Sequence, residues 1–186
     1  MTIREEQRRR VTEQLGEHLL ATGLSRTSVR QLAAAAGISD RMLLYYFTDK
    51  SEALSEAMGH VAGRLGGWLD AAMPFGLRLP PDRLLAATAR IVTEPEVRPF
   101  MALWMEVIAA AGRGEAPYAE IAGQVTGGFL TWIDARLDLA MDVDKRRATV
   151  GLILATVDGL ALLEVGAGPE TARLAAERTA DLRFNG

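Results

Sequence analysis

Apolar residues recur along most of this chain at intervals of three and four, which is the spacing of one face of an α-helix. Near the N-terminus Val11, Leu15 and Leu19 follow this spacing, and Gly23 comes directly after the pattern ends. The alternation of apolar and polar residues that is typical of strands is nearly absent. The pattern therefore predicts an all-α protein.

The same periodicity, read between breaks, predicts nine helices. The clearest break is the segment 73–81, which contains three prolines. The expected helices cover about 4–22, 29–36, 40–48, 50–73, 81–94, 96–112, 118–140, 144–165 and 170–182.

The segment from 27 to 50 contains several helix start and stop signals. Ser28 and Gln31 have the spacing of a capping box, and Ser39 and Asp49 are good N-caps for the next two helices. Gly37 can adopt the left-handed conformation that ends one helix and turns the chain into the next. Two short helices joined by a tight glycine turn, after a longer helix, form a helix-turn-helix.

Six large apolar or aromatic residues follow one another at 42–47. With Ser39 as the cap, Leu43 and Phe47 face inward, and Met42, Tyr45 and Tyr46 face outward. A folded monomer gains nothing by exposing two tyrosines and a methionine to water, whereas a DNA major groove would accommodate them. The alternative is that both tyrosines pack under the rest of the protein, and the short segment by itself favours neither interpretation.

Composition and charge narrow the function classes. The chain has 186 residues and no cysteine, which excludes thiol catalysis, disulfides and cysteine-ligated metals and suits a reducing cytoplasm. The N-terminal residues are polar and basic, without an apolar core of the signal-peptide type, so export is not expected. The apolar run 150–163 is too short to span a bilayer and contains Asp158, so no membrane span is expected.

The net charge of −3 is unevenly distributed. Residues 1–50 carry eight basic and six acidic residues, a charge of +2, and the rest carries −5. This split indicates only modestly that the N-terminal part meets a polyanion, because ordinary scatter along a chain produces such a difference about as often.

The stretch TSVRQLAAAAGISDRMLLYYFTDKSEAL, from Thr27 to Leu54, resembles the DNA-binding region of the tetracycline-repressor (TetR) family of bacterial transcriptional regulators. The matching features are the Thr-Ser start, the Ala-Gly-Ile-Ser turn, the Tyr-Tyr-Phe segment and the lysine three residues later. The resemblance implies DNA contacts from Ser28, Arg30, Ser39, Arg41, Met42, Leu44, Tyr45 and Tyr46, and a phosphate contact from Lys50.

Three residues depart from the family pattern. Asp40 stands where a basic or amide residue is usual, Arg41 replaces a small residue, and Leu44 replaces a frequent tyrosine. An acid at position 40 repels phosphate but is able to accept a hydrogen bond from a cytosine amine. These departures change the expected operator sequence and leave the expected mode of binding unchanged.

The resemblance also implies two domains, a helix-turn-helix DNA-binding domain at 1–50 and a helical ligand-binding and dimerisation domain at 51–186. The implied function is a transcriptional regulator, a repressor that a small apolar or aromatic effector releases from a palindromic operator. Methionine beside tryptophan suits such a ligand, although each residue taken singly is more typical of plain core than of a pocket. The expected pocket is lined by Trp68, Arg90, Phe100, Met101, Trp104, Met105, Glu106 and Phe129.

A homodimer is expected through the segments 118–140 and 144–165. Gly123, Gly127 and Gly128 permit a close approach of helices, and residues 150–163 are apolar nearly all round. The alternative for both segments is the core of a monomer.

Two other function classes are open. An enzyme needs a catalytic constellation, but His18 and His60 have no nucleophile or carboxylate at a suitable spacing, and no cofactor or metal is expected. The basic runs 8–10 and 145–147 are more typical of solvated helix ends than of sites, although the first is able to reach flanking phosphates. A helical ligand-binding or scaffolding protein without DNA recognition is the second alternative, and Asp40 is the residue that favours it.

Overall fold

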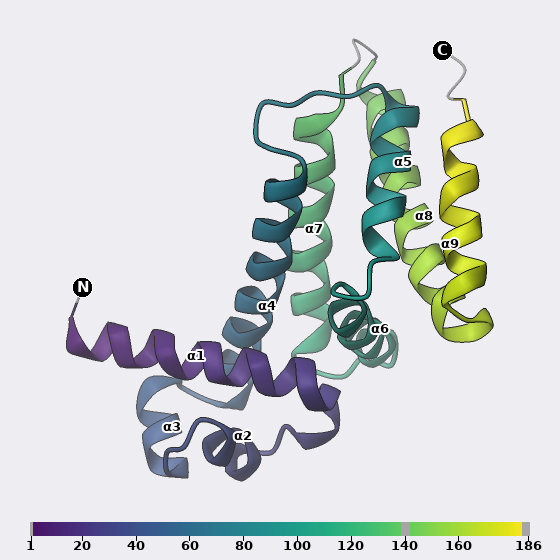
Figure 1. The fold of residues 1–186 in the computed structure, drawn as a ribbon. Coiled ribbons are helices and arrows are strands. Elements are labelled where there is room, and N and C mark those ends of the chain that lie inside the picture. The colour runs from purple at the N-terminus through teal and green to yellow at the C-terminus, as the bar shows by residue number, and fades with distance from the viewer. Residues whose placement is uncertain (1, 139–141, 184–186) are drawn as a thin grey trace. The chain divides into compact units, whose positions relative to one another are not determined.

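The computed structural model describes residues 2–138 and 142–183, which form nine α-helices and two short 3₁₀ turns (Figure 1). The prediction of an all-α protein is confirmed. The elements are α1 Ile3–Thr22, η1 Gly23–Arg26, α2 Val29–Ala35, α3 Asp40–Tyr46, α4 Lys50–Ala72, α5 Pro81–Val92, α6 Arg98–Gly112, α7 Tyr118–Arg136, α8 Val143–Ala167, α9 Pro169–Arg178 and η2 Thr179–Asp181.

The chain divides into two compact units. The first consists of the residues up to Gly66 together with Ala102–Val125, and the second of Gly67–Met101 together with the chain from Thr126 onward. The chain passes between the units within α4, α6 and α7. All of residues 1–50 belong to the first unit, and the assignment of DNA contacts to these residues stays a prediction.

The predicted helix at 118–140 is wrong at its end, because α7 ends at Arg136. The main chain leaves the helix to pair with the segment before α5: the amide of Leu79 donates to the Arg136 carbonyl oxygen and the amide of Asp138 donates to the Leu79 carbonyl oxygen, both at 2.8 Å. Leu79 and Leu137 thereby form an isolated bridge. Residues 139 and 140 of the predicted helix lie outside the described part of the chain.

The core of the first unit forms as the apolar spacing predicts. Leu15 and Leu19 of α1, Leu32 of α2, and Leu43 and Phe47 at α3 are at most 1% exposed. These side chains belong to three helices that are each too short or too polar to be stable alone, so mutual burial holds the unit together.

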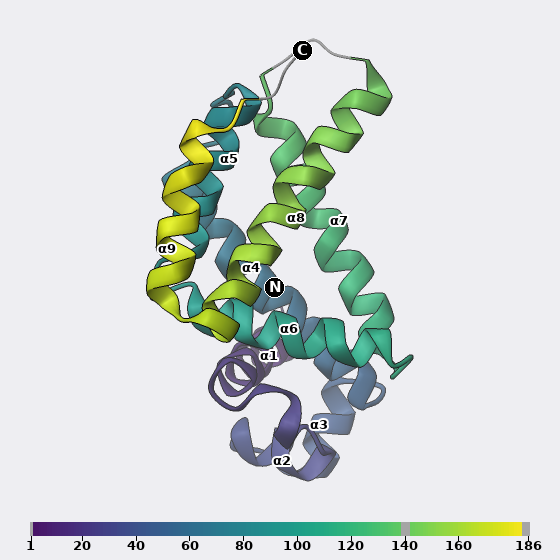
Figure 2. The same cartoon turned by 90° about the vertical axis from the view of Figure 1, so that its right-hand side faces the viewer.

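The second unit is built around α8, which packs on α5 and α9 (Figures 1 and 2). Ile153 and Leu160 on one face of α8 are buried, whereas Leu152 and Leu162 on another face are more than half exposed. By length and composition α8 is also apolar enough to cross a membrane, with a mean hydropathy of 1.8 over its most apolar window. Helix α8 therefore has one apolar face that is buried in its own unit and a second apolar face that is exposed.

A buried cation joins α7 to the end of α4 within the second unit. The Arg136 side chain is 3% exposed and pairs with Asp70 at 2.5 Å. Its Nε donates to the Met73 carbonyl oxygen at 2.8 Å, and its guanidinium lies 4.0 Å from the centre of the Trp132 ring. Asp70 also accepts a hydrogen bond from the Trp132 indole at 2.7 Å. The buried charge is thus paired and hydrogen-bonded, as such groups require.

Candidate nucleic-acid interface

The local signals between 27 and 50 produce the expected helix-turn-helix. The Ser28 hydroxyl accepts from the Gln31 amide at 3.3 Å, and the Gln31 side chain accepts from the Ser28 amide at 3.1 Å. Ser39 caps α3 by accepting from the Met42 amide at 3.2 Å. Gly37 between the two helices has φ +64°, a conformation that favours glycine. The predicted capping box, cap and glycine turn are confirmed.

Helix α3 separates its side chains as predicted except at Tyr46, which was expected on the outer face and is half-buried. Leu43 and Phe47 are 0% and 1% exposed, whereas Tyr45 is 56%, Leu44 48% and Met42 37% exposed. Tyr46 is half-buried, and its ring meets the Tyr45 ring edge to face with 5.4 Å between centroids. The outer face of this short helix is therefore apolar, aromatic and accessible.

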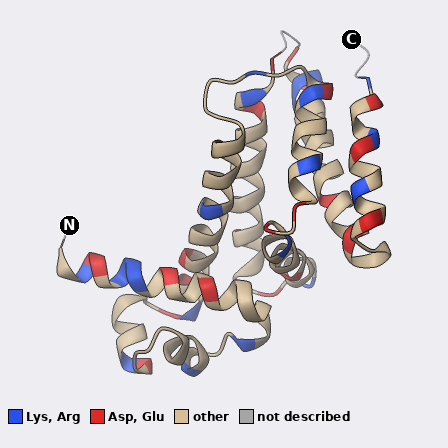
Figure 3. Ribbon diagram, viewed as in Figure 1, with Lys and Arg blue, Asp and Glu red and all other residues tan. Residues whose placement is uncertain are grey.

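The other residues that the family resemblance implies for DNA are exposed as well. Ser28 and Arg30 lie at the start of α2, Ser39 and Arg41 at the start of α3, and Lys50 is the first residue of α4. Helices α2 and α3 pack side by side, and Figure 3 shows basic residues on them. All of these residues thus belong to the first unit, and their contacts with DNA stay a prediction.

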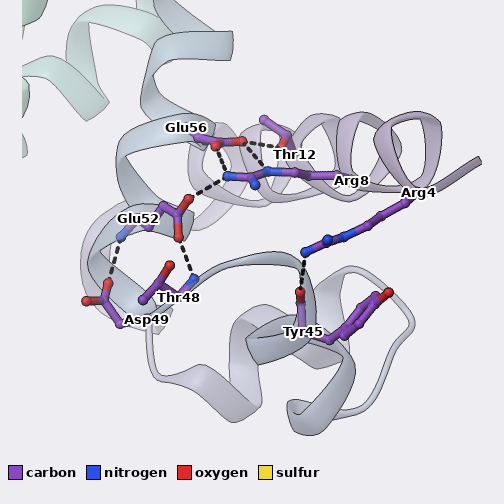
Figure 4. Close-up of polar contacts among 8 residues, drawn as sticks. All are labelled: Arg4, Arg8, Thr12, Tyr45, Thr48, Asp49, Glu52 and Glu56. Carbon is purple, nitrogen blue, oxygen red and sulfur yellow. Dashed lines mark hydrogen bonds and ion pairs between the residues drawn. The ribbon is translucent and has the colours of Figure 1, made fainter. Parts of the chain in front are cut away.

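A polar network holds the α3–α4 turn against α1 (Figure 4). The Arg8 guanidinium pairs with Glu52 at 2.6 Å, and its Nε donates to Glu56 at 3.2 Å. Glu52 also accepts a hydrogen bond from the Thr48 amide, and its own amide donates to Asp49 at 2.9 Å, which confirms Asp49 as the cap of α4. Arg8 is therefore a structural residue of this turn and is half-buried, so the run 8–10 is not uniformly solvated.

The network shifts the acidity of Glu52. The hydrogen bond from the Thr48 amide, assisted by Arg8, lowers the pKa of Glu52 to about 2. A carboxyl whose pKa is lower in the folded state than in the unfolded state stabilises the fold above the unfolded pKa, and this contribution is lost as the pH falls through the folded pKa.

We expect the contribution of Glu52 to stability to be complete above about pH 4.5 and to fade toward pH 2. The measurement is the free energy of unfolding of the wild type and Glu52→Gln between pH 6 and pH 3. The wild type is the more stable at pH 6, and the difference between the two proteins narrows on acidification. A difference that stays constant with pH would contradict this assignment.

A second contact, which no local sequence pattern indicates, joins α6 to the turn after α1. The Glu106 carboxylate accepts a hydrogen bond from the Leu24 amide at 2.7 Å. The neighbouring Gly23 has φ +63°, and a Cβ built on it would overlap the same carboxylate. His18 adds a third tie, because its Nε2 lies 2.8 Å from the Arg26 carbonyl oxygen. These contacts fix the path of η1 toward α2.

Gly23→Ala is expected to lower the free energy of unfolding by about 2 kcal/mol, because an alanine at φ +63° and ψ −156° is strained and its Cβ displaces the Glu106 carboxylate. Gly37→Ala is the matched control: Gly37 has nearly the same φ, +64°, but an added Cβ there meets no atom within 4 Å. Urea unfolding should therefore show a larger loss of stability for Gly23→Ala, which combines backbone strain with the displaced carboxylate. Equal losses would mean that the Glu106 contact contributes nothing.

The residues predicted for a small-molecule pocket are divided between the units. Glu106 is engaged with Leu24 and lines a hollow of about 670 Å³ in the first unit, together with Lys50, Arg113 and Tyr118. Trp104 and Met105 belong to the first unit as well, and both are half-buried. The remaining five, all in the second unit and half-buried except for the exposed Arg90, are Trp68, Arg90, Phe100, Met101 and Phe129. The pocket stays a prediction.

A further hollow, of about 610 Å³, lies in the second unit between α7 and α8, and Thr131, Asp134 and Arg147 are among its lining residues. Among the described residues no group of three or more His, Asp or Glu side chains is arranged to hold a metal ion.

The capped helices α2 and α3, joined by a tight turn and with the outer face of α3 exposed, have the arrangement of helix-turn-helix DNA-binding regulators. Residues 16–57 match the model of the family described as bacterial regulatory proteins, tetR family. By this match the helix-turn-helix region of the chain, with the end of α1 and the start of α4, is of the TetR type.

Solved structures share the fold over nearly the whole chain. A transcriptional regulator from Rhodococcus sp. Rha1 is 24% identical, with a TM-score of 0.72 and 94% of each chain covered. A TetR transcription regulator from Haloarcula marismortui is 18% identical, with a TM-score of 0.69 and coverage of 95% of this chain and 97% of that one. The multidrug binding protein EbrR, solved with proflavin, is 19% identical, with a TM-score of 0.62 and coverage of 93% and 99%. No curated protein matches the sequence.

Proposed function

We propose that this protein is a sequence-specific transcriptional regulator that inserts the outer face of α3 into the major groove of an operator. The observation that carries the proposal is the division of α3, in which Leu43 and Phe47 are buried while Met42, Leu44 and Tyr45 are exposed. A helix with a buried inner face and an apolar, aromatic outer face is suited to contact a surface outside its own subunit.

Each exposed side chain has chemistry that DNA can use. The tyrosine hydroxyls donate to phosphate oxygens, and Met42 and Leu44 make apolar contacts with thymine methyl groups. Arg41 donates to guanine or phosphate, and Lys50 to phosphate. Asp40 is exposed at the first position of α3, where it complements the helix dipole and accepts from a cytosine amine.

Gel shift of the purified protein against the DNA upstream of its own gene tests this function. We expect a specific complex whose affinity falls steeply with salt, with a log–log slope of about −0.9 for each phosphate neutralised. A protein that binds neither this DNA nor random duplex at low salt would instead be a ligand-binding or scaffolding protein, and the proposal would fail.

The proposed regulator is cytoplasmic and acts as a homodimer. One helix-turn-helix makes few base contacts, whereas a two-fold dimer binds both halves of a palindrome. Support comes from α8, whose Leu152, Leu162 and Val165 are more than half exposed. On α7 a Cβ added at Gly123 or Gly127 meets no atom within 4 Å, so a second helix has room to approach. We place the dimer face on these two helices.

Leu162→Glu is expected to convert the dimer to a monomer, because it buries a charge in the proposed interface. Sedimentation velocity measures the change, and operator affinity should fall in parallel. Leu174→Glu on α9 is the matched control, since Leu174 is 49% exposed and lies outside the proposed face. A wild type that sediments as a monomer at micromolar concentration would refute the dimer.

We further propose that the protein is a repressor released by a small apolar or aromatic effector. EbrR, which shares the fold, was solved with the planar aromatic cation proflavin, and this chain carries Trp68, Trp104 and Phe129 as half-buried aromatics. Proflavin is therefore the first probe. Titration into the preformed operator complex should dissociate it, and saturating proflavin that leaves operator affinity unchanged would exclude this ligand class.

A further inference from the structure

Arg4 lies in the first turn of α1 and contacts a residue 41 positions later. Its Nη2 donates to the main-chain oxygen of Tyr45 at 3.3 Å, and its guanidinium carbon lies 4.8 Å from the centre of the Tyr45 ring. Figure 4 shows the side chain reaching from α1 to this tyrosine. The Tyr46 ring also meets the Tyr45 ring edge to face, with 5.4 Å between centroids. The most exposed ring of α3 is thus held by two neighbours.

The position of this contact on α3 explains why a cation suits it. Helix α3 has seven residues, and the last four carbonyl groups of a helix have no partner within it unless the cap supplies one. The Phe47 amide donates a hydrogen bond to the Leu43 carbonyl oxygen. Arg4 donates a hydrogen bond to the Tyr45 carbonyl oxygen. Its positive charge is also favourable there, because the C-terminal end of a helix carries a partial negative charge. The same guanidinium attracts the negative face of the tyrosine ring.

We propose that Arg4 is a positioning residue for DNA recognition, which fixes the last turn of α3 and the direction of the Tyr45 ring before DNA arrives. The proposal rests on the proposed function of α3. An exposed side chain loses conformational freedom when it binds, and this loss weakens binding. A ring that Arg4 already holds loses less conformational freedom on binding, so the free protein is preorganised for the complex with DNA.

A direct contact from Arg4 to a phosphate is the competing explanation for any effect on DNA binding. The two roles differ in salt dependence, because removing one phosphate contact from each protomer reduces the log–log slope by about 2 for a dimer. The two roles also differ in the energetic coupling between Arg4 and Tyr45, because a residue that positions the Tyr45 ring affects DNA affinity only while that ring is present. Arg10 on the same helix is exposed and makes no ion pair or ring contact among the described residues, so it is a matched control for charge.

The first arm of the experiment uses the free protein. Amide hydrogen exchange in the last turn of α3 is measured for the wild type, Arg4→Ala and Arg10→Ala. We expect exchange at residues 45–47 to be severalfold faster in Arg4→Ala and unchanged in Arg10→Ala. Unchanged exchange in Arg4→Ala overturns the proposal whatever the protein does with DNA.

The second arm is a double-mutant cycle on operator affinity. Arg4→Ala should weaken binding about tenfold in the wild type but less than about twofold in Tyr45→Ala, with an unchanged salt slope. Equal losses in both backgrounds, or a slope reduced by about 2, would overturn the positioning role. A wild type that binds no DNA would defeat the proposed function and with it this role in recognition, whereas faster exchange in the first arm would still report the structural contact.

Discussion

Tyr45→Ala is expected to weaken operator binding roughly a hundredfold while leaving the fold intact. A hydrogen bond to a charged phosphate contributes about 1.5 kcal/mol, and a dimer loses two of them. Since the Tyr45 side chain is 56% exposed, its loss removes little buried surface, and the melting temperature should change by less than about 2 °C. Fluorescence anisotropy with labelled operator and thermal unfolding by circular dichroism measure the two effects.

The control for this prediction is Tyr45→Phe, which keeps the ring over Arg4 and removes only the hydroxyl. It should lose most of the affinity if the hydroxyl contacts phosphate, and little if the ring contacts an apolar base edge. A Tyr45→Ala protein that unfolds, or one that binds DNA as the wild type does, would show that this ring is not part of the interface.

Phe47→Ala, two residues further along the chain, should have the opposite outcome. Phe47 is 1% exposed, and removing a fully buried phenylalanine side chain costs about 3–5 kcal/mol. It also removes the ring over which the Arg8 guanidinium lies at 5.1 Å. We expect a melting temperature lower by about 10 °C, with DNA binding lost only as far as the first unit unfolds.

Phe47→Leu fills most of the same space and should recover more than half of the lost stability, measured by urea unfolding. Comparable stability losses for Tyr45→Ala and Phe47→Ala would mean that α3 presents a different face from the one described. The pair of substitutions therefore tests the orientation of α3 without any knowledge of the operator.

The parts of this structure that could be predicted from the sequence are those set by near neighbours. Ser28, Gly37 and Ser39 act on residues within four positions, so the helix-turn-helix and the faces of α3 follow from local rules. The apolar spacing that predicts Leu43 and Phe47 as buried is equally local, and the burial of both is confirmed.

The contacts that the sequence did not reveal join distant residues. Arg8 meets Glu52 across 44 positions, and Glu106 meets the Leu24 amide across 82. The early end of α7 has the same origin, because Leu79 competes for the main-chain groups of residues 136–138. No periodicity along the chain records such pairings. For this reason the pattern along the chain predicted a solvated Arg8 and did not indicate the contact between Arg4 and Tyr45.

The most direct test of the central claim, that the outer face of α3 contacts DNA, is hydrogen exchange of the protein with and without bound operator. We expect amides at 40–47 to exchange more slowly in the complex, and a random duplex at the same salt to give weaker protection. A protein that binds the operator while α3 exchanges at its free rate would contradict the claim.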